Sequence, residues 1–159
     1  EAVARRARAG KPTVYRWWPS KAALLLDVYH RQKLNIEYPQ TGSQEEDIYR
    51  FLRSLLRQWS KTPTGQIFRS IIAEAQSDPT AAEALAAYAA DRRRHTGEMI
   101  TQAIQRGEVP ADVDPQLVAD MIAGYAWIQL LTGRLDQDEA TTRKAARYLA
   151  RGLVRTAKS

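Results

Sequence analysis

The chain has 159 residues, which is enough for one hydrophobic core or for a small head joined to one core. It contains no cysteine, which excludes disulfides and thiolate metal sites and suits a reducing cytoplasm. No apolar run approaches the roughly 20 residues that span a bilayer, and no signal peptide is visible. We therefore expect a cytoplasmic protein that does not associate with a membrane.

The positive charge is concentrated at the start of the chain. Residues 1–34 hold eight basic and two acidic side chains, whereas residues 35–159 hold sixteen of each. The net charge of +6 therefore lies entirely in the first fifth of the sequence. A basic head on a neutral body is typical of a nucleic-acid-binding protein. A basic solvated helix, or one that touches anionic lipid, would show the same pattern.

The sequence predicts an all-α fold. Ala, Leu, Arg, Gln and Glu are abundant, helix breakers recur at intervals, and no segment alternates apolar and polar residues long enough to predict a strand. In chain order, helices are expected over residues 1–7, 11–17 and 20–37, around an apolar stripe over 48–59, and over 67–75, 79–106, 115–132 and 138–156. Residues 38–43 are expected to form a loop. Residues 62–65 are expected to form a break between two helices.

Capping residues support several of these boundaries. Ser20 can cap the helix that follows it, and Asp78 followed by Pro79 is typical of a helix start. Gly107 is a plausible stop for the long helix, because glycine accepts the left-handed conformation that ends many helices.

The most specific pattern lies in residues 1–21. A basic helical segment is followed by the three-residue turn Arg8-Ala9-Gly10 and by a short helix from Lys11 to Trp17. Pro12 falls in the first turn of that short helix, where its missing N–H costs nothing. Helix, three-residue turn and short helix make up the helix-turn-helix layout, which places the start of the second helix against base edges in the major groove.

The run KPTVYRWWPSK, preceded by AVARRARAG, resembles the helix-turn-helix signature of the TetR/AcrR family of transcriptional regulators. The segments DPTAAEAL, RGEVPADVDPQLVADMIAGYAW and LLTG resemble the C-terminal domain of one common subgroup, so the resemblance covers nearly the whole chain. It implies a helix-turn-helix head with its connecting helix over 1–36, and a ligand-binding and dimerisation domain over 37–159. Arg8 and Gly10 depart from the family pattern. The family's first helix is absent before Glu1, so we expect an N-terminally incomplete regulator.

The resemblance assigns DNA contacts to the second helix of the head and to the start of the next helix. Thr13 offers a hydroxyl to phosphate and a methyl to thymine, and Tyr15 and Trp17 can hydrogen-bond flanking phosphates. Lys21 would pair with a phosphate, and Lys11 with a guanine edge or a phosphate. The candidate DNA-binding residues are Lys11, Pro12, Thr13, Tyr15, Arg16, Trp17 and Lys21.

Val14 and Trp18 lie on the opposite side of the same helix, which predicts that they form the core of the head. The alternative for Tyr15 and Trp17 is that they also pack inside this small head. Within this motif we favour DNA contact.

The resemblance also implies a cavity for a small effector among the middle helices. Its candidate residues combine aromatic walls with a few polar tips: Trp59, Phe68, Ile72, Gln76, Tyr88, Met99, Met121 and Tyr125. For each of these alone, ordinary core packing is the alternative. The run DRRRH over 91–95 is expected on a solvated face of the long helix. In the alternative, one arginine points inward to an anionic ligand. We favour the solvated face, because an unpaired buried charge is costly.

The last two helices are implied to form an antiparallel four-helix bundle with a second subunit. The helix over 115–132 is too apolar for only one buried side, and the last helix carries small residues that permit close approach. The alternative is a helix enclosed within one subunit. The candidate interface residues are Tyr125, Ile128, Ala145, Tyr148, Leu149, Gly152 and Leu153. A symmetric homodimer would present two heads to the two half-sites of a palindromic, double-stranded DNA operator.

The sequence gives little support to an enzyme. His30 and His95 are isolated, and no paired-histidine metal motif, glycine-rich phosphate loop or nucleophile elbow is present. We therefore expect no catalytic residue, metal or cofactor. The expected function is a repressor released from its operator by a small-molecule effector. The alternative is a helical adaptor, or a basic membrane- or nucleic-acid-associated protein without operator specificity, although residues 1–17 lack the long apolar face that a lipid-bound helix needs.

Overall fold

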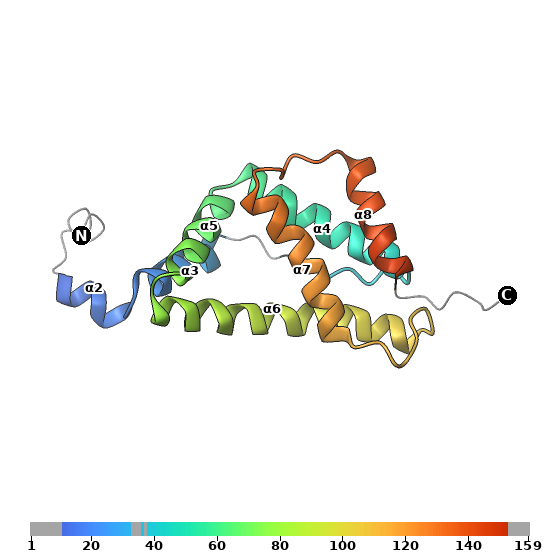
Figure 1. The fold of residues 1–159 in the computed structure, drawn as a ribbon, viewed down its shortest axis with the longest axis horizontal. Coiled ribbons are helices and arrows are strands. Elements are labelled where there is room, and N and C mark those ends of the chain that lie inside the picture. Colours follow the sequence, from blue (N-terminus) through green and yellow to red (C-terminus); the bar gives the residue numbers. More distant parts are fainter. Residues whose placement is uncertain (1–10, 33–35, 37, 153–159) are drawn as a thin grey trace.

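The computed structural model describes residues 11–32, 36 and 38–152, and these residues form helices and no strand. The expected all-α fold is confirmed (Figure 1). The helices are α2 (Lys11–Trp17), α3 (Lys21–Gln32), α4 (Gln44–Lys61), α5 (Thr64–Ala75), α6 (Pro79–Gln105), α7 (Pro115–Leu131) and α8 (Glu139–Arg151).

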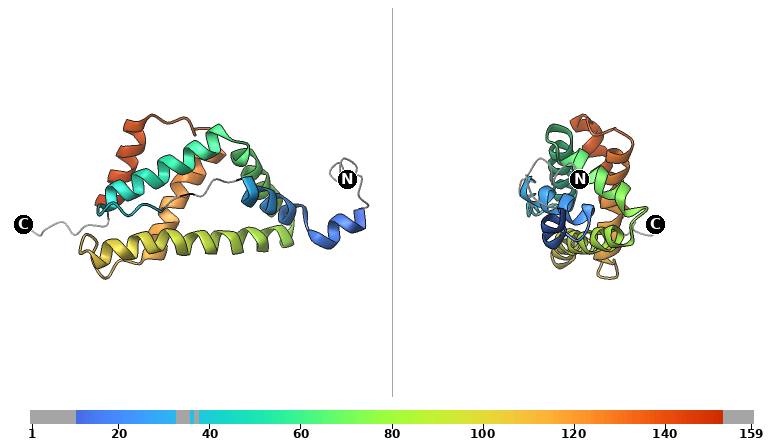
Figure 2. Two further views of the ribbon diagram at one scale, coloured as in Figure 1. Left: turned by 180° about the vertical axis from the view of Figure 1, so that it is seen from behind. Right: turned by 90° about the vertical axis from the view of Figure 1, so that its left-hand side faces the viewer.

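The long helix α6 and the helix α4 run along opposite sides of the body, and α7 crosses between them (Figures 1 and 2). Helix α8 packs on α4, and α3 packs on α5 and α6 at the other end of the body. Helix α2 projects beyond α3 at the end of the molecule farthest from α8 (Figures 1 and 2). The arrangement therefore separates a small N-terminal element from a larger helical body.

Local capping explains where most of these helices begin and end. The Ser20 hydroxyl accepts a hydrogen bond from the backbone N–H of Ala23 at 3.0 Å, and the Asp78 carboxylate accepts one from the N–H of Thr80 at 2.9 Å. Gly107 follows α6 with a φ of 77°, a conformation that glycine adopts without strain. The expected caps at Ser20 and Asp78 and the expected stop at Gly107 are confirmed.

Two expected boundaries are wrong. The helix expected over 20–37 ends at Gln32 among the described residues, and Ile36 lies outside any helix and packs against the core. The expected break over 62–65 is shorter, and α5 already begins at Thr64. The Thr62 hydroxyl donates to the carbonyl of Gln58 at 2.7 Å and lies 2.7 Å from the Thr64 hydroxyl, so side chains bridge the two helices.

The expected helix over 1–7, the turn over 8–10 and any continuation of the last helix past Gly152, including Leu153, lie outside the described residues. No helix in the described part of the chain is long and apolar enough to cross a membrane.

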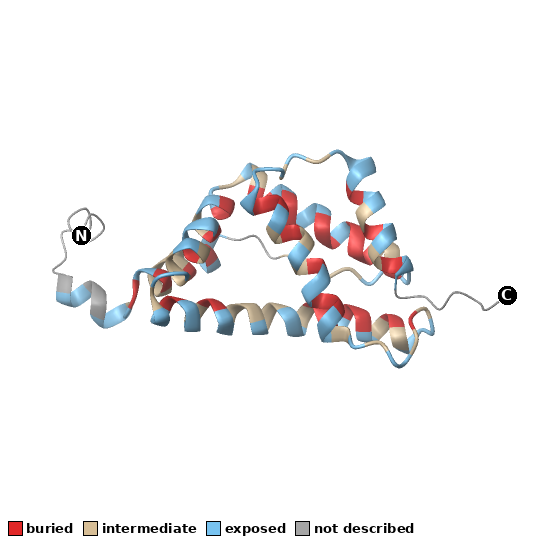
Figure 3. Cartoon of the chain, viewed as in Figure 1, coloured by how far each residue is buried: buried red, intermediate tan, exposed pale blue. Residues whose placement is uncertain are grey.

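The core lies where α4, α5, α6 and α7 meet (Figure 3). Helix α4 buries one continuous apolar stripe, as its 3.6-residue periodicity predicts. Each of the other three helices adds a fully buried side chain: Ile71 from α5, Ile100 from α6 and Ile122 from α7. These contacts fix the positions of the helices that surround the cavity described below.

Candidate functional site

The projecting helix α2 exposes most of the described side chains that the sequence analysis assigned to DNA. Pro12, Thr13 and Arg16 are exposed, and Trp17 leaves 69% of its surface open to solvent. An indole this exposed on a helix that stands clear of the body has no packing role in the described structure. The side chains of Lys11 and Tyr15 lie outside the described residues.

The neighbouring tryptophan has a different environment. Trp18 is half-buried, and its indole N–H donates to the Asp27 carboxylate on α3 at 3.1 Å. Arg31 also donates to Asp27 at 3.1 Å, and this bond, with that of Trp18, holds the pKa of Asp27 below its usual value. The structure thus places Trp18 against α3, as the sequence predicts, and leaves Trp17 outward.

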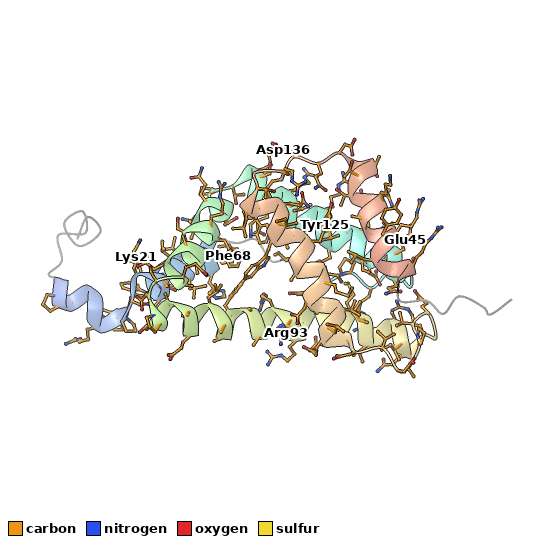
Figure 4. The ribbon with its side chains drawn as sticks, in the orientation of Figure 1. Lys21, Glu45, Phe68, Arg93, Tyr125 and Asp136 are labelled. Atoms are coloured by element: carbon orange, nitrogen blue, oxygen red, sulfur yellow. The ribbon has the colours of Figure 1, made fainter. Side chains whose placement is uncertain are left out.

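Lys21 joins this N-terminal region to the body. Its ammonium lies 2.6 Å from the carboxylate of Glu74 on α5, and the lysine side chain remains 64% exposed (Figure 4). The sequence analysis expected Lys21 to pair with phosphate. In the structure Lys21 is paired with Glu74 instead, so a phosphate would have to compete with this carboxylate for the lysine.

A cavity of about 320 Å³ lies among α4, α6 and α7. Helix α4 lines it with Phe51, Leu55 and Trp59, which are four residues apart and therefore share one face. Helix α6 lines it with Tyr88, Arg92 and Thr96, again at a spacing of four. Helix α7 contributes mainly small side chains and leaves the space open. The remaining lining residues are Ile36, Tyr38, Phe68, Ala89, Arg93, Ala119, Asp120, Ala123, Gly124 and Trp127.

Phe68 on α5 connects the walls of this cavity. Its ring centroid lies 5.1 Å from that of Tyr29 on α3, 5.5 Å from Trp59 on α4, 5.4 Å from Tyr88 on α6 and 5.4 Å from Trp127 on α7. Such distances are those of favourable aromatic pairs. Figure 4 shows Phe68 inside the body beside α3 and α5. One ring therefore contacts aromatic side chains of α3, α4, α6 and α7.

Tyr29 brings α3 into this cluster. It is fully buried, its ring meets that of Tyr88 edge-on at 5.8 Å, and its hydroxyl accepts a hydrogen bond from the Trp59 indole at 3.1 Å. Burial raises the pKa of Tyr29, so the phenol stays protonated. The helix that follows the exposed α2 thus contacts three residues that line the cavity.

Arg92 is the half-buried cation of the cavity wall. Its guanidinium donates to the Asp91 carboxylate and lies 5.8 Å from the centroid of the Tyr88 ring. Burial lowers the pKa of Arg92, but the hydrogen bond to Asp91 and the nearby tyrosines outweigh it and raise that pKa overall. Within the run over 91–95, Arg92 and Arg93 line the cavity, and Arg92 is the less exposed of the two.

Trp59, Phe68 and Tyr88 are the residues of the expected pocket that line this cavity. Met99 is buried in the core, and Ile72 is half-buried against it. Gln76 is exposed and donates to the carbonyl of Ile72 at 3.1 Å. The other two candidates lie toward α8: Met121 is 53% exposed, and the Tyr125 hydroxyl donates to Gln137 at 2.7 Å.

Sequence reasoning missed several residues of the wall. Phe51 and Leu55 were recognised only as core, although they share the face of Trp59 at helical spacing. That spacing is a usable signal once one member is assigned to the cavity. Tyr38 comes from the loop before α4, and no local pattern indicates where a loop residue packs.

Helices α7 and α8 expose an apolar outer face. On α7 the exposed positions Leu117, Met121, Gly124, Ile128 and Leu131 alternate at spacings of four and three. This is the repeat of helices that pack against other helices in bundles and coiled coils. Beside it, Met121 and Tyr125 form a shallow groove with residues of α8: Thr141, Lys144, Ala145, Tyr148, Leu149 and Gly152.

The expected dimer-interface residues all map to this outer face where the structure describes them. Ile128, Tyr148 and Gly152 are exposed, whereas Tyr125, Ala145 and Leu149 are half-buried. The sequence analysis missed Leu117 and Leu131 and assigned Met121 to the interior.

Helix α8 is attached to α4 by charged contacts. The Arg143 guanidinium donates to Glu46 of α4 at 3.0 Å and to Glu139 of its own helix at 2.9 Å. It also lies 3.8 Å from the centroid of the Tyr49 ring, within range of a cation–π interaction. These contacts orient α8, which carries one of the two parts of the apolar outer face, on α4.

Residues 38–149 match the family described as "Tetracyclin repressor-like, C-terminal domain". The chain belongs to the TetR family. The matched segment contains every residue that lines the cavity except Ile36, and every residue named for the outer face except Gly152. The crystal structure of TetR family transcription regulator SCO0332 superposes with a TM-score of 0.78 at 31% identity, covering 97% of this TetR-family chain and 86% of that one.

Curated relatives agree with the assignment. The chain is 29% identical over 131 residues to the uncharacterized HTH-type transcriptional regulator YdeS of Bacillus subtilis, covering 81% of this chain and 66% of YdeS. It is 31% identical over 137 residues to the DNA-binding transcriptional repressor TetR of Mycobacteroides abscessus, covering 84% of this chain and 71% of that protein. This TetR-family chain thus spans just under two thirds of YdeS.

Proposed function

We propose that this TetR-family protein is a DNA-binding transcriptional repressor that binds a palindromic operator as a homodimer and releases it when a small effector occupies the cavity. In this proposal residues 1–36 form the DNA-binding head, and residues 37–159 bind the effector and the second subunit. The observation that carries the proposal is the exposure of Thr13, Arg16 and Trp17 on a helix that stands clear of the body.

The chemistry of this helix suits DNA. The exposed Thr13 and Trp17 can hydrogen-bond phosphate oxygens through a hydroxyl and an indole N–H, and Arg16 can pair with phosphate or guanine. Lys11, Pro12, Tyr15 and Lys21 complete the proposed DNA-binding set. The charge distribution supports the same role, since the entire net charge of +6 belongs to residues 1–34.

The outer face of α7 and α8 supports a homodimer. A monomer that leaves Leu117, Met121, Ile128 and Leu131 exposed in one stripe presents a surface that a second copy can bury. Two-fold pairing of α7 and α8 would form a four-helix bundle and bring two copies of α2 to two half-sites.

The aromatic cluster supports release by an effector. A ligand in the cavity contacts Trp59 and Tyr88, and both contact Tyr29 on α3. A ligand that binds better when α3 is displaced lowers operator affinity by the difference in its affinity for the two states. Tyr29 is therefore proposed as the positioning residue that couples the cavity to the head.

The test is a salt-dependent binding assay on the DNA immediately upstream of the gene, with a scrambled duplex as the comparison. We expect tight, salt-sensitive binding to one palindromic segment. Arg16→Ala and Trp17→Ala should each reduce it about tenfold or more, because each removes a direct contact. Arg57→Ala is the matched control, since Arg57 is also exposed on a helix, α4, but lies on the body.

Equal binding to the palindromic and scrambled duplexes would favour a basic head without sequence specificity. A folded dimer that includes the first helix of the head and binds neither duplex at low salt would contradict the proposal and return the helical-adaptor alternative to first place.

A further inference from the structure

We infer that the ligand of the cavity is a small aromatic carboxylate, held by Arg92 at one edge and by stacked rings around its apolar body. This inference rests on the proposed function, because it names the chemical class of the effector. It depends on the two-sided character of the cavity and on the charge balance around Arg92.

The cavity has an apolar side and a polar side. The face of α4 presents Phe51, Leu55 and Trp59, with no polar group except the Trp59 indole N–H, which already donates to Tyr29. The face of α6 presents Tyr88, Arg92 and Thr96. A ligand that fills this space needs a flat apolar body against α4 and one polar edge toward α6.

Aromatic side chains dominate the wall. Tyr38 stacks on Phe51 at 5.4 Å, and Trp59 stacks on Phe68 at 5.5 Å. Helix α7 lines the cavity with Ala119, Ala123 and Gly124, which are small, and with Asp120 and Trp127. A planar ligand suits a wall rich in rings because offset stacking on ring faces is favourable. The volume of about 320 Å³ is near the lower end for small-molecule sites, which favours a ligand of one to three rings.

The charged side chains that line the cavity leave an excess of one positive charge, because Arg92 and Arg93 stand against one carboxylate, Asp120. Arg93 is paired with Asp120 at 2.7 Å, and Asp91 is shared between Arg92 and Arg94.

Arg94 is 66% exposed and does not line the cavity, but it binds the same Asp91 carboxylate as Arg92. Arg92 is the cation that the wall holds with only a share of one carboxylate. A guanidinium has five N–H donors in a planar fork that matches a carboxylate. A monoanion balances the single excess charge, whereas a phosphate dianion would exceed it. These considerations select a carboxylate on an aromatic body.

The test uses calorimetric titration of the protein with matched pairs of probes: benzoate and benzamide, 2-naphthoate and 2-naphthamide, and anthracene-2-carboxylate and its amide. Each pair differs mainly in charge. We expect at least one carboxylate to bind about tenfold or more tightly than its amide, because hydrogen bonds to a charged group are stronger than those to a neutral one.

The variants assign this preference to one side chain. Arg92→Gln should reduce the carboxylate-to-amide ratio to about one, and Arg92→Lys, which keeps the charge but loses the fork, should leave an intermediate ratio. Arg57→Gln is the control: it removes an exposed arginine that does not line the cavity, and should leave the ratio unchanged. Far-UV circular dichroism checks that each variant is folded.

The inference is overturned if no aromatic carboxylate binds, if the amides bind equally well, or if folded Arg92→Gln keeps the preference. Operator binding by the same preparations without ligand separates this failure from a failure of the proposed function. Intact operator binding with no carboxylate preference removes only the ligand class. Absent operator binding removes the repressor proposal, whatever the cavity binds.

Discussion

The indole N–H of Trp59 donates to the hydroxyl of Tyr29 at 3.1 Å, inside the protein and across thirty residues of sequence. Trp59 lines the cavity from α4, and Tyr29 belongs to α3, the helix next to the exposed α2. One hydrogen bond therefore joins the wall of the cavity to the helix that positions the proposed DNA-binding head. Both partners are buried, so water does not replace either one when the bond is broken.

Tyr29→Phe is expected to destabilise the protein by about 1–2 kcal/mol, because it leaves the buried indole N–H without its acceptor. The ring contacts to Phe68 and Tyr88 would remain. Urea unfolding measures the change. Ser54→Ala is the control, since it removes the hydroxyl of an exposed residue of α4 and should unfold as the wild type does. Equal stability of Tyr29→Phe and wild type would show that the bond contributes little.

Gly65→Ala is expected to destabilise the protein, although alanine is the better helix former. A Cβ at position 65 would overlap the backbone carbonyl oxygen of Trp59, and backbone atoms cannot move aside as a flexible side chain can. A cost above about 1 kcal/mol is expected from such overpacking. Ser70→Ala on the same helix is the control for helix propensity, because Ser70 is exposed. A thermal unfolding midpoint for Gly65→Ala at or above that of the wild type would contradict the prediction.

Met121→Glu is expected to convert a dimer into a folded monomer. The side chain lies in the middle of the exposed stripe on α7, and a symmetric interface would bring two unpaired glutamates into an apolar seam. Light scattering after size exclusion gives the mass of each species. Ala87→Glu adds the same charge to an exposed position of α6 and should leave the mass of the dimer unchanged. A dimeric Met121→Glu would place the interface elsewhere.

Acid is expected to weaken the attachment of α8. Hydrogen bonds from Arg50 and then Arg143 hold the pKa of Glu46 below its usual 4.5, and Arg143 does the same for Glu139. A carboxyl whose pKa is depressed by folding stabilises the folded state above its unfolded pKa, and loses that contribution as the pH falls through the folded value. Stability should therefore fall as the pH drops below about 4.5.

Arg143→Gln tests the origin of this acid sensitivity. Both carboxyls lose a cationic partner, so their pKa values move toward the usual range and the decline with acid becomes shallower. Thermal unfolding of the variant and the wild type between pH 3 and pH 7 supplies the comparison. Parallel curves would mean that other groups dominate the acid response.

Local signals made much of the fold predictable. Ser20, Asp78 and Pro79 determine helix starts through their own side chains and the next two or three backbone N–H groups, so sequence alone reveals them. The apolar stripe of α4 follows the 3.6-residue period of the helix, so the sequence also predicts which side of α4 is buried. The error at the end of α3 has the opposite cause. Ile36 leaves the helix to pack in the core, which is a tertiary effect that no local pattern encodes.

The cavity was less predictable than the helices. Trp59, Phe68 and Tyr88 were found because aromatic residues in the middle helices are good candidates for a binding site. Met121 was misplaced because α7 is apolar on both sides, and hydrophobicity alone does not distinguish a side that faces the core from a side left exposed. Arg92 follows Tyr88 by four residues, which places both on one face of α6. Because Arg93 and Arg94 are also arginines, the sequence did not show which of the three lies at the cavity.

The Lys21–Glu74 ion pair has a consequence for the proposed contact between Lys21 and DNA. The lysine ammonium already lies 2.6 Å from the Glu74 carboxylate, and a DNA phosphate must displace this carboxylate before it can bind the lysine. In the proposed complex, Lys21 would exchange its ion pair with Glu74 for one with DNA, so the gain in affinity would be small. The displaced Glu74 carboxylate would remain near the phosphate and repel it. The same ion pair would thus limit the affinity for the proposed operator.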